Sequence, residues 1–402
     1  MALMLKGLKV LDFTNNIAGP TTSALMADHG AEVIKIEKPV LGDDVRGFAP
    51  VVDGTSIPHF YNNRSKKSIV LDLKDSRAID IVKKLVKDTD VLVEASRPGV
   101  MEKLGLGYEA IKKIKPDIIY CSISAFGQKG PYKNRAGYDV IAQAFSGCMY
   151  YTGNGDGRPT KVATPIGDMT AALSAYGSIM EALFYRQLSG KGQHIDINLA
   201  RSATWLGSDF SFLITGKDRE RGGMHDCTLC PYGIFEGSGG EHLVIATVSA
   251  KLWAALCAVM GKPDYADDPK YCSHTARIEH RPEVIGMIES WLKSFDRIED
   301  AAKVLDEAGI PNCKVNTFRD IYEDAHVQEN EWLATIPSPK SVKSTDSCKV
   351  VAEFAVFSEG ENVFNPAPDL GQHNYEILRK YGLSNDEIDA MQTEWRDKIL
   401  KR

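Results

Sequence analysis

Asp168 is the residue whose type and position offer the clearest chemistry. It lies in the segment Lys161-Val-Ala-Thr-Pro-Ile-Gly-Asp-Met-Thr-Ala-Ala-Leu173, where small residues predict a closely packed helix that begins near the aspartate. Local sequence favours a helix N-cap, which accepts backbone N–H groups and complements the helix dipole. A carboxylate at this place can also act as a nucleophile, because it can attack an acyl group and later leave again.

A second candidate is the segment His225-Asp-Cys-Thr-Leu-Cys230, which offers a histidine and two cysteines as zinc ligands. A structural zinc site needs a fourth ligand, and the sequence holds no second Cys-x-x-Cys pair. The strand-like Tyr232-Gly-Ile-Phe235 follows directly. We therefore interpret these cysteines as loop residues and predict no metal site.

The elements that must position such residues form a βαβ pattern in the first half of the chain. Short apolar, β-branched runs alternate with helical stretches, which indicates a doubly wound parallel sheet. The predicted strands cover residues 8–13, 31–37, 68–73, 91–94, 118–124 and 194–198, and the predicted helices cover 21–30, 76–88 and 167–188.

Beyond residue 200 the pattern changes to a smaller α+β region. We predict an α/β fold with a large domain over residues 1–221, a small α+β domain over 222–325, and a return of 326–402 to the large domain. The segment Gly237-Ser-Gly-Gly240 lies between two predicted strands and is interpreted as a hairpin turn.

The α/β pattern is also typical of dinucleotide-binding domains, and Glu37 lies near where an acidic residue would hold a ribose. The turn after the first strand argues against that function. It reads Thr14-Asn-Asn-Ile-Ala-Gly-Pro20 and lacks the Gly-x-Gly-x-x-Gly that lets a backbone approach a pyrophosphate. We therefore predict no nicotinamide or flavin cofactor.

Composition is that of an ordinary soluble globular protein. The chain has 402 residues, 43% of them hydrophobic, and its net charge of −6 leaves no basic stripe for nucleic acid or a membrane surface. We find no secretory signal and no apolar run long enough to span a bilayer. Eight scattered cysteines favour free thiols in a reducing compartment, so we expect a cytoplasmic protein.

Several separated motifs follow one another along nearly the whole chain. They are Leu8-Lys-Val-Leu-Asp-Phe13, Ala18-Gly-Pro20, Gly30-Ala-Glu-Val-Ile-Lys-Ile-Glu-Lys-Pro39, Gly42-Asp-Asp-Val-Arg46, Asn63-Arg-Ser-Lys-Lys-Ser-Ile-Val-Leu-Asp-Leu-Lys74, Gly137-Tyr-Asp139, Gln143-Ala-Phe-Ser-Gly147, Gly167-Asp168, Gly190-Lys-Gly-Gln193 and Pro368-Asp-Leu-Gly-Gln-His373. Together they resemble the family III CoA-transferases, which include the formyl-CoA and L-carnitine CoA-transferases.

The resemblance implies an enzyme that transfers CoA between an acyl-CoA donor and a carboxylic acid acceptor. The catalytic aspartate of the family falls on Asp168, which would form a mixed anhydride and then an aspartyl-CoA thioester. CoA would be the only cofactor, as a co-substrate. The family forms an interlocked homodimer, so we expect a second copy of this chain as the partner.

The resemblance also implies residues that bind CoA and substrate. Cations for the CoA phosphates would be Lys38, Lys74, Arg97 and Lys103, each of which is equally well interpreted as a solvated surface charge. Tyr138 falls at a position that lies near the catalytic aspartate in the family. A buried core tyrosine is a competing interpretation of this residue. The other implied site residues are Ile17, Ala18, Leu71, Leu73, Gly137 and Asp139, with the two leucines at the adenine pocket.

Two departures from the formyl-CoA branch bear on specificity. That branch has a glutamine where this chain has Ile17, and it has a glycine run in the small domain that this chain lacks. The chain is therefore more similar to the carnitine and 2-hydroxyacyl type. Ile17 and the pair Tyr150-Tyr151 suggest a larger or less polar acyl group than formate or oxalate.

Two alternative functions stay open. The α-methylacyl-CoA racemases share the fold and the aspartate but use a histidine in a Gly-His-Asp segment, which here is Gly137-Tyr-Asp139. A phenol is a poor proton-exchange partner near neutral pH. The other alternative is a non-catalytic CoA-binding protein on the same fold, because fold alone does not determine function.

Overall fold

A six-stranded parallel sheet forms the centre of the large unit. The computed structural model describes residues 2–154, 157–207, 212–352 and 354–401. The strands lie in the order β6-β3-β2-β7-β8-β9. The chain first adds β3 and β6 on one side of β2 and then adds β7, β8 and β9 on the other side. Their bounds are β2 (Lys9–Phe13), β3 (Glu32–Glu37), β6 (Lys67–Val70), β7 (Val91–Glu94), β8 (Ile119–Ser124) and β9 (Gln193–Asn198).

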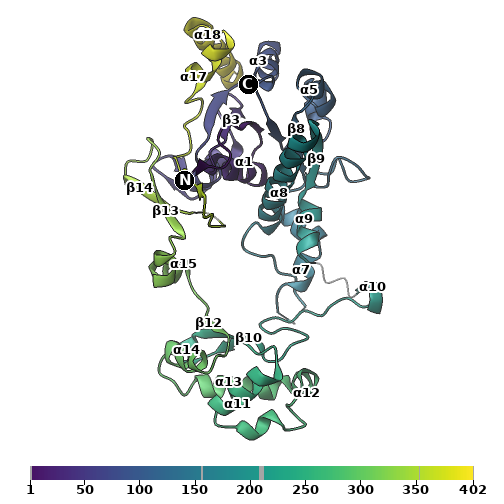
Figure 1. The fold of residues 1–402 in the computed structure, drawn as a ribbon, viewed down its shortest axis with the longest axis vertical. Helices are drawn as coiled ribbons and strands as arrows, with labels where there is room; N and C mark the ends of the chain where they lie inside the picture. Colours follow the sequence, from purple (N-terminus) through teal and green to yellow (C-terminus); the bar gives the residue numbers. More distant parts are fainter. Residues whose placement is uncertain (1, 155–156, 208–211, 353, 402) are drawn as a thin grey trace. The chain divides into compact units, whose positions relative to one another are not determined.

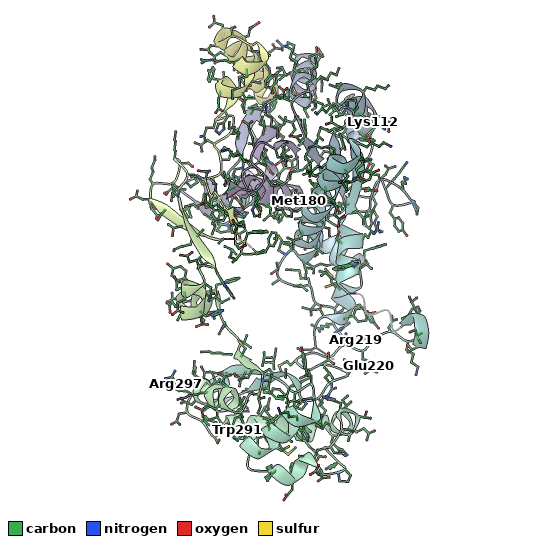
Figure 2. The ribbon with its side chains drawn as sticks, in the orientation of Figure 1. Lys112, Met180, Arg219, Glu220, Trp291 and Arg297 are labelled. Carbon is green, nitrogen blue, oxygen red and sulfur yellow. The ribbon has the colours of Figure 1, made fainter. Side chains whose placement is uncertain are left out.

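Helices cover both faces of this sheet. On one face the apolar side of the sheet packs against α1 (Ala18–Asp28), α8 (Ile166–Ser189) and α9 (Leu199–Leu206). Figure 1 shows α8 running beside β8 and β9, and Met180, labelled in Figure 2, is one of the α8 side chains at this core. The other face carries α3 (Ser76–Val86), α5 (Tyr108–Ile114), α17 (Asn374–Leu378) and α18 (Asn385–Leu400).

Two boundaries show the largest differences from the sequence prediction, three residues each. Helix α1 begins at Ala18 rather than at residue 21, because Pro20 in the first turn costs no hydrogen bond there. Strand β6 ends at Val70 instead of residue 73, where Leu71 and Leu73 continue as a loop toward α3. The predicted α/β fold with a parallel sheet is otherwise confirmed.

Shorter elements complete the large unit. Parallel or antiparallel pairs form between β1 (Ala2–Leu3) and β15 (Gly360–Glu361), β4 (Val51–Val52) and β5 (Thr55–Ser56), and β13 (Leu333–Pro337) and β14 (Ser347–Val351). The remaining helical pieces are η1 (Asp44–Gly47), α2 (Ile57–Asn62), α4 (Val100–Lys103), α6 (Asp139–Phe145) and η4 (Arg379–Tyr381).

The chain divides into two compact units. The large unit comprises residues 1–146, 163–208 and 330–402, and the small unit comprises 147–162 and 209–329. The domain boundaries at 221 and 325 and the expected dimer stay predictions. None of the described helices is both long and apolar enough to cross a membrane.

The small unit is built on an antiparallel sheet of β10 (Tyr232–Glu236), β11 (His242–Ala246) and β12 (Asn312–Lys314). The segment 237–240 joins the first two strands, so its interpretation as a hairpin turn is confirmed. Trp291, labelled in Figure 2, contacts Phe295 edge to face. The helices are α7 (Cys148–Tyr151), α10 (Phe212–Thr215), η2 (Ser238–Gly240), α11 (Ala250–Val259), η3 (Pro263–Ala266), α12 (His274–Glu279), α13 (Arg281–Leu292), α14 (Ile298–Glu307), α15 (Phe318–Glu323) and α16 (Ala325–Glu329).

Candidate active site

A cavity of about 200 Å³ lies at the carboxyl edge of the large unit's sheet. Its walls come from the segments that follow β2, β7 and β8, including Asn15 and Asn16, residues 95–98 and residues 135–138. The order in which successive strands are added to the sheet changes direction between β2 and β7, and open α/β sheets bind ligands at such a switch point. Of the sequence-predicted site residues, the cavity wall contains Arg97, Gly137 and Tyr138.

Four charged side chains pair in the protein interior, next to the loop after β2 that lines this cavity. The Nζ atom of Lys35 lies 2.9 Å from an Asp43 oxygen and 3.8 Å from an Asp12 oxygen, and all three side chains are fully buried. The Nζ atom of Lys66, also fully buried, lies 2.9 Å from Asp12. We call Asp12, Lys35, Asp43 and Lys66 the buried charge network.

The buried charge network holds the loop that follows β2. Lys35 donates to the carbonyl oxygen of Thr14 at 2.8 Å, and Asp43 accepts from the backbone N–H of Asn16 at 3.0 Å. Asn16 has a φ of +68°, a backbone conformation that residues other than glycine seldom adopt. The network therefore stabilises a strained loop that lines the cavity.

Sequence reasoning missed these four residues as a group. Each lies inside one of the quoted motifs, but no role was assigned to any of them. The available signal was a charge within an apolar strand, since Asp12 lies in β2 and Lys35 in β3. Their pairing joins separate segments, and a single sequence does not reveal such partners.

The N-cap interpretation of Asp168 was wrong. Helix α8 begins at Ile166 after the N-cap residue Pro165, so Asp168 lies inside the first turn. The acceptor for the free amides comes from Asp139 in α6, which takes the N–H of Gly167 at 2.7 Å and that of Asp168 at 3.3 Å. This carboxylate is 28 residues from Gly167 in the chain, which is why local sequence did not reveal it.

Two neighbours adjust this capping contact. The side-chain amide of Gln143 donates to the second oxygen of Asp139 at 2.7 Å, which orients the carboxylate. Any Cβ at Gly167 would lie 3.1 Å from the Asp139 oxygen, so glycine permits the close approach. Asp139 is therefore a capping residue of α8 as well as a neighbour of Asp168.

The carboxylate of Asp168 is half-buried and has no hydrogen-bond or ion-pair partner among the residues that the structure describes. Burial raises the pKa of Asp168 to about 7, and the nearby charge of Asp139 contributes in the same direction. At an N-cap position, hydrogen bonds from backbone N–H groups would have lowered the pKa of this carboxyl group instead. The observed site instead brings the proton equilibrium of Asp168 close to neutrality.

Helix α1 contacts α8 close to the N-terminal ends of both helices. Thr22, in the second turn of α1, donates from its hydroxyl group to the carbonyl oxygen of Ala172, in the second turn of α8, at 3.3 Å. Helix α1 follows β2 and α8 leads back into β9, so both helices begin at the carboxyl edge of the sheet. This arrangement brings the predicted residues Ile17 and Ala18 to the same edge as Asp168.

Predicted cations differ in their surroundings. Lys38 pairs with Asp44, a residue of the cavity wall, and both side chains are exposed. Arg97 lines the cavity itself. Lys74 and Lys103 are exposed and are not part of this cavity wall, so the structure does not bring the four cations together here.

The other predicted contacts are divided between core and surface. Leu71 is 1% exposed and belongs to the apolar core, and Leu73 packs against that core. Leu71 therefore serves the packing of the sheet in this structure. Tyr138 is 68% exposed, so the interpretation of a buried core tyrosine was wrong.

The segment 225–230 shows loop contacts. The thiol of Cys227 donates to the carbonyl oxygen of Glu220 at 3.1 Å, and Cys230 is buried. Within the described ranges, no group of three or more His, Cys, Asp or Glu side chains is placed to hold a metal ion.

Comparison with known proteins identifies the family. A family model described as CoA-transferase family III matches residues 5–374. The chain belongs to CoA-transferase family III. Its resemblance to this family, predicted from the motifs, is confirmed, and the protein is an acyl-CoA:carboxylate CoA-transferase.

Relatives of this CoA-transferase cover almost its full length. It is 37% identical to the succinyl-CoA:glutarate CoA-transferase of Mus musculus over 94% of this chain and 86% of the relative. It is 32% identical to the succinyl-CoA–D-citramalate CoA-transferase of Chloroflexus aurantiacus over 97% of each chain. A CAIB/BAIF family protein from Brucella suis superposes with a TM-score of 0.83 at 30% identity, covering 94% of this chain and 100% of that one.

Proposed function

We propose that Asp168 is the nucleophile through which this CoA-transferase passes CoA from an acyl-CoA donor to a carboxylic acid. The supporting observation is a half-buried carboxylate without a partner among the described residues, in the first turn of α8. It adjoins Asp139, the residue that follows the cavity wall at Tyr138. Buried structural carboxylates are normally paired, so an unpaired one at this edge favours chemistry.

The proposed reaction balances without water or electron transfer. A carboxylate oxygen of Asp168 attacks the thioester carbon, the C–S bond breaks, and CoA leaves as a thiolate. The thiolate then attacks the Asp168 carbonyl carbon of the mixed anhydride, which releases the donor acid and forms an aspartyl-CoA thioester. The acceptor carboxylate attacks the carbonyl carbon of that thioester, its C–S bond breaks, and CoA thiolate leaves as a second anhydride forms. The thiolate then attacks the acceptor acyl carbon, which gives the new acyl-CoA and releases the Asp168 carboxylate.

Each step develops negative charge on a carbonyl oxygen, which needs hydrogen-bond donors. We propose the backbone N–H groups of Ala18 and Gly19, because amides in the first turn of a helix have no partner within that helix. A Cβ at Gly19 would lie 2.4 Å from the Thr14 side chain, so this turn requires glycine. These donors stand at the same sheet edge as Asp168.

The names of the relatives suggest the substrate acids. The relatives described above are named for succinyl-CoA with glutarate or D-citramalate, so we propose small carboxylic acids as the substrates of this enzyme. The larger, less polar acyl group expected from Ile17 and Tyr150-Tyr151 does not fit these relatives. CoA as sole co-substrate, the homodimer and the cytoplasmic location remain parts of this proposal.

A trapping experiment tests the nucleophile. The protein is incubated with succinyl-CoA, treated with hydroxylamine or borohydride, and digested for mass spectrometry. We expect the modification on Asp168, and we expect Asp168→Ala to lose transfer by about 10³-fold or more. As a matched control, Asp80→Ala changes an exposed aspartate of α3 and should retain full activity.

Other outcomes would select the other functions. Full transfer activity in Asp168→Ala, or modification at another residue alone, would contradict the mechanism. Deuterium uptake from solvent at an α-carbon, without CoA exchange, would indicate a racemase. CoA binding with no exchange across a panel of acids would indicate a binding protein.

A further inference from the structure

Two neighbouring carboxyl groups at the candidate active site receive unequal numbers of hydrogen bonds. Asp139 accepts the backbone N–H of Gly167 at 2.7 Å and that of Asp168 at 3.3 Å. It also accepts from the side-chain amide of Gln143 at 2.7 Å. The Asp168 carboxyl group accepts none from the residues that the structure describes. Hydrogen bonds to a carboxylate favour its ionised form, so the negative charge of this pair is held on Asp139.

Gln143 is the side-chain donor in this arrangement, and it is fully buried. Its Nε2 atom lies 2.7 Å from Oδ2 of Asp139 and 3.4 Å from the carbonyl oxygen of Thr164, in the segment that leads into α8. A carbonyl oxygen only accepts hydrogen bonds, so the amide of Gln143 presents its N–H donors, and not its own oxygen, on this side. Gln143 therefore favours the charged form of Asp139 and ties α6 to the start of α8.

Asp139 is the one charge that acts on Asp168 among the described residues. The pKa of Asp168 is raised by burial and, as the second cause, by the charge of Asp139. The titratable side chains on the elements that pack against α6 and α8 are Asp28 of α1, Tyr120 and Cys121 of β8, His194 and Asp196 of β9, and Arg201 of α9. None of these six contributes to the shift. Along α8 itself, the next charged residue is Glu181, about three and a half turns away.

Repulsion between the two carboxylates affects acylation as well as proton binding. It disfavours ionised Asp168 relative to any uncharged form, whether that form is the protonated acid, the mixed anhydride or the CoA thioester. Forming the thioester converts the Asp168 carboxylate into an uncharged acyl group, and the negative charge departs with the donor acid. A charge held on Asp139 therefore favours the covalent enzyme over the free enzyme.

We propose that Gln143 is a positioning residue that holds the negative charge on Asp139, and that this charge favours the acylated forms of Asp168. The inference rests on the proposed function, because it takes Asp168 as the acylated group. The net step balances: donor acyl-CoA and the Asp168 carboxylate give the aspartyl-CoA thioester and the donor acid. A C–S bond forms at Asp168, the C–S bond of the donor breaks, and one Asp168 oxygen leaves in the acid.

The covalent fraction of the enzyme tests the proposal. The protein is mixed at about pH 8.5, where Asp168 is ionised, with succinyl-CoA and a fixed excess of succinate. The mixture is quenched in acid, and intact-mass spectrometry gives the fraction that carries CoA. We expect Asp139→Asn to lower the equilibrium constant for acylation by about 10-fold and Gln143→Met to lower it by about 3-fold.

The pH dependence of kcat/KM for the donor should change by a matching amount. One pH unit in the midpoint corresponds to a factor of ten in an equilibrium constant. The midpoint should therefore fall by about one pH unit in Asp139→Asn and by about half a unit in Gln143→Met. A midpoint that moves without a change in the covalent fraction would overturn the inference, because the same repulsion acts on both.

A double substitution separates this role of Gln143 from a purely structural one. In the Asp139→Asn background, Gln143→Met should change neither quantity further, because no charge remains for the amide to hold. The control Gln187→Met changes an exposed glutamine of α8 and should match wild type. Circular dichroism checks that each variant is folded. Asp139→Asn keeps an acceptor for the Gly167 amide, so it tests the charge even if Gln143→Met does not fold.

The outcomes distinguish this inference from the proposed function. A covalent enzyme whose equilibrium constant is unchanged in Asp139→Asn would overturn the inference and leave Asp168 as the nucleophile. Equal losses from Gln143→Met in both backgrounds would assign Gln143 to packing alone. The absence of any CoA adduct on the wild-type protein would overturn the proposed function, and this inference with it.

Discussion

Two regions of the large unit use charge in opposite ways. In the buried charge network, Asp12 is surrounded by Lys35 and Lys66 and receives a hydrogen bond from the Ser23 hydroxyl group at 2.7 Å. At the candidate active site, the one charge that shifts the pKa of Asp168, among the residues that the structure describes, is that of another carboxylate, Asp139. One region pairs its charges and the other leaves a charge unpaired.

The pKa values of the two aspartates consequently shift in opposite directions. Burial alone would raise the pKa of Asp12, but the charges of Lys35 and Lys66 lower it well below its usual range. Burial raises the pKa of Asp168 to about 7, with no cation to oppose it. Cations neutralise the charge of the first aspartate, and the second retains a proton affinity that suits the nucleophile proposed above.

Removing a member of the network should show the largest effect on stability. Asp12→Ala leaves Lys35 and Lys66 without their shared partner, and we expect the free energy of unfolding to fall by about 3–5 kcal/mol. Urea denaturation followed by circular dichroism measures this change. The control Asp80→Ala removes an exposed pair with Lys83 and should cost less than about 1 kcal/mol. Equal losses in the two variants would remove the distinction between the regions.

Replacing the unpaired aspartate, Asp168, should have the opposite effect on the free energy of unfolding. The pKa of Asp168 is higher in the folded state than its ordinary value of 3.8, so ionising the group above that pH costs stability. We expect Asp168→Asn to stabilise the protein by about 2 kcal/mol at pH 8, less than the full shift implies because the group stays partly solvated. No change is expected at pH 4, where the carboxyl group is protonated in wild type.

Thermal unfolding at both pH values measures this difference. Destabilisation at pH 8 would mean that Asp168 is a structural residue like Asp12. The paired aspartate gives the complementary pH dependence. Because the pKa of Asp12 is lowered by folding, its contribution is present above pH 3.8 and is lost as the pH falls further.

The smallest expected effect is a shift in the pH dependence of kcat/KM. In the proposed mechanism only ionised Asp168 attacks, so kcat/KM for the donor should rise with pH and level off above a midpoint near pH 7. Asp139→Asn keeps an oxygen for the Gly167 amide but removes the charge that raises the pKa of Asp168. The midpoint should therefore move to lower pH. Initial rates across pH 5–9 measure it, and an unchanged midpoint would assign the shift to burial alone.

Much of the architecture could be predicted from residue patterns. Alternating apolar runs indicated the parallel sheet, and the wrong glycines in Thr14–Pro20 argued against a dinucleotide site although the strand order is the one such proteins use. The ordered motifs indicated the family from the sequence alone. These features depend on local periodicity and on residue types, which the sequence contains directly.

The pattern did not predict the partners of individual charges. Asp168 was interpreted as an N-cap because its own neighbours suit one, whereas the capping group is Asp139, 28 residues from Gly167.

The sequence by itself determined the fold class, the family and the presence of a carboxylate at residue 168. Only the tertiary structure decided what that carboxylate does differently from Asp12. Both are aspartates near the carboxyl edge of the same sheet, and desolvation acts on each. The outcome depends on whether cations from distant segments reach the buried group, and folding alone brings those segments together.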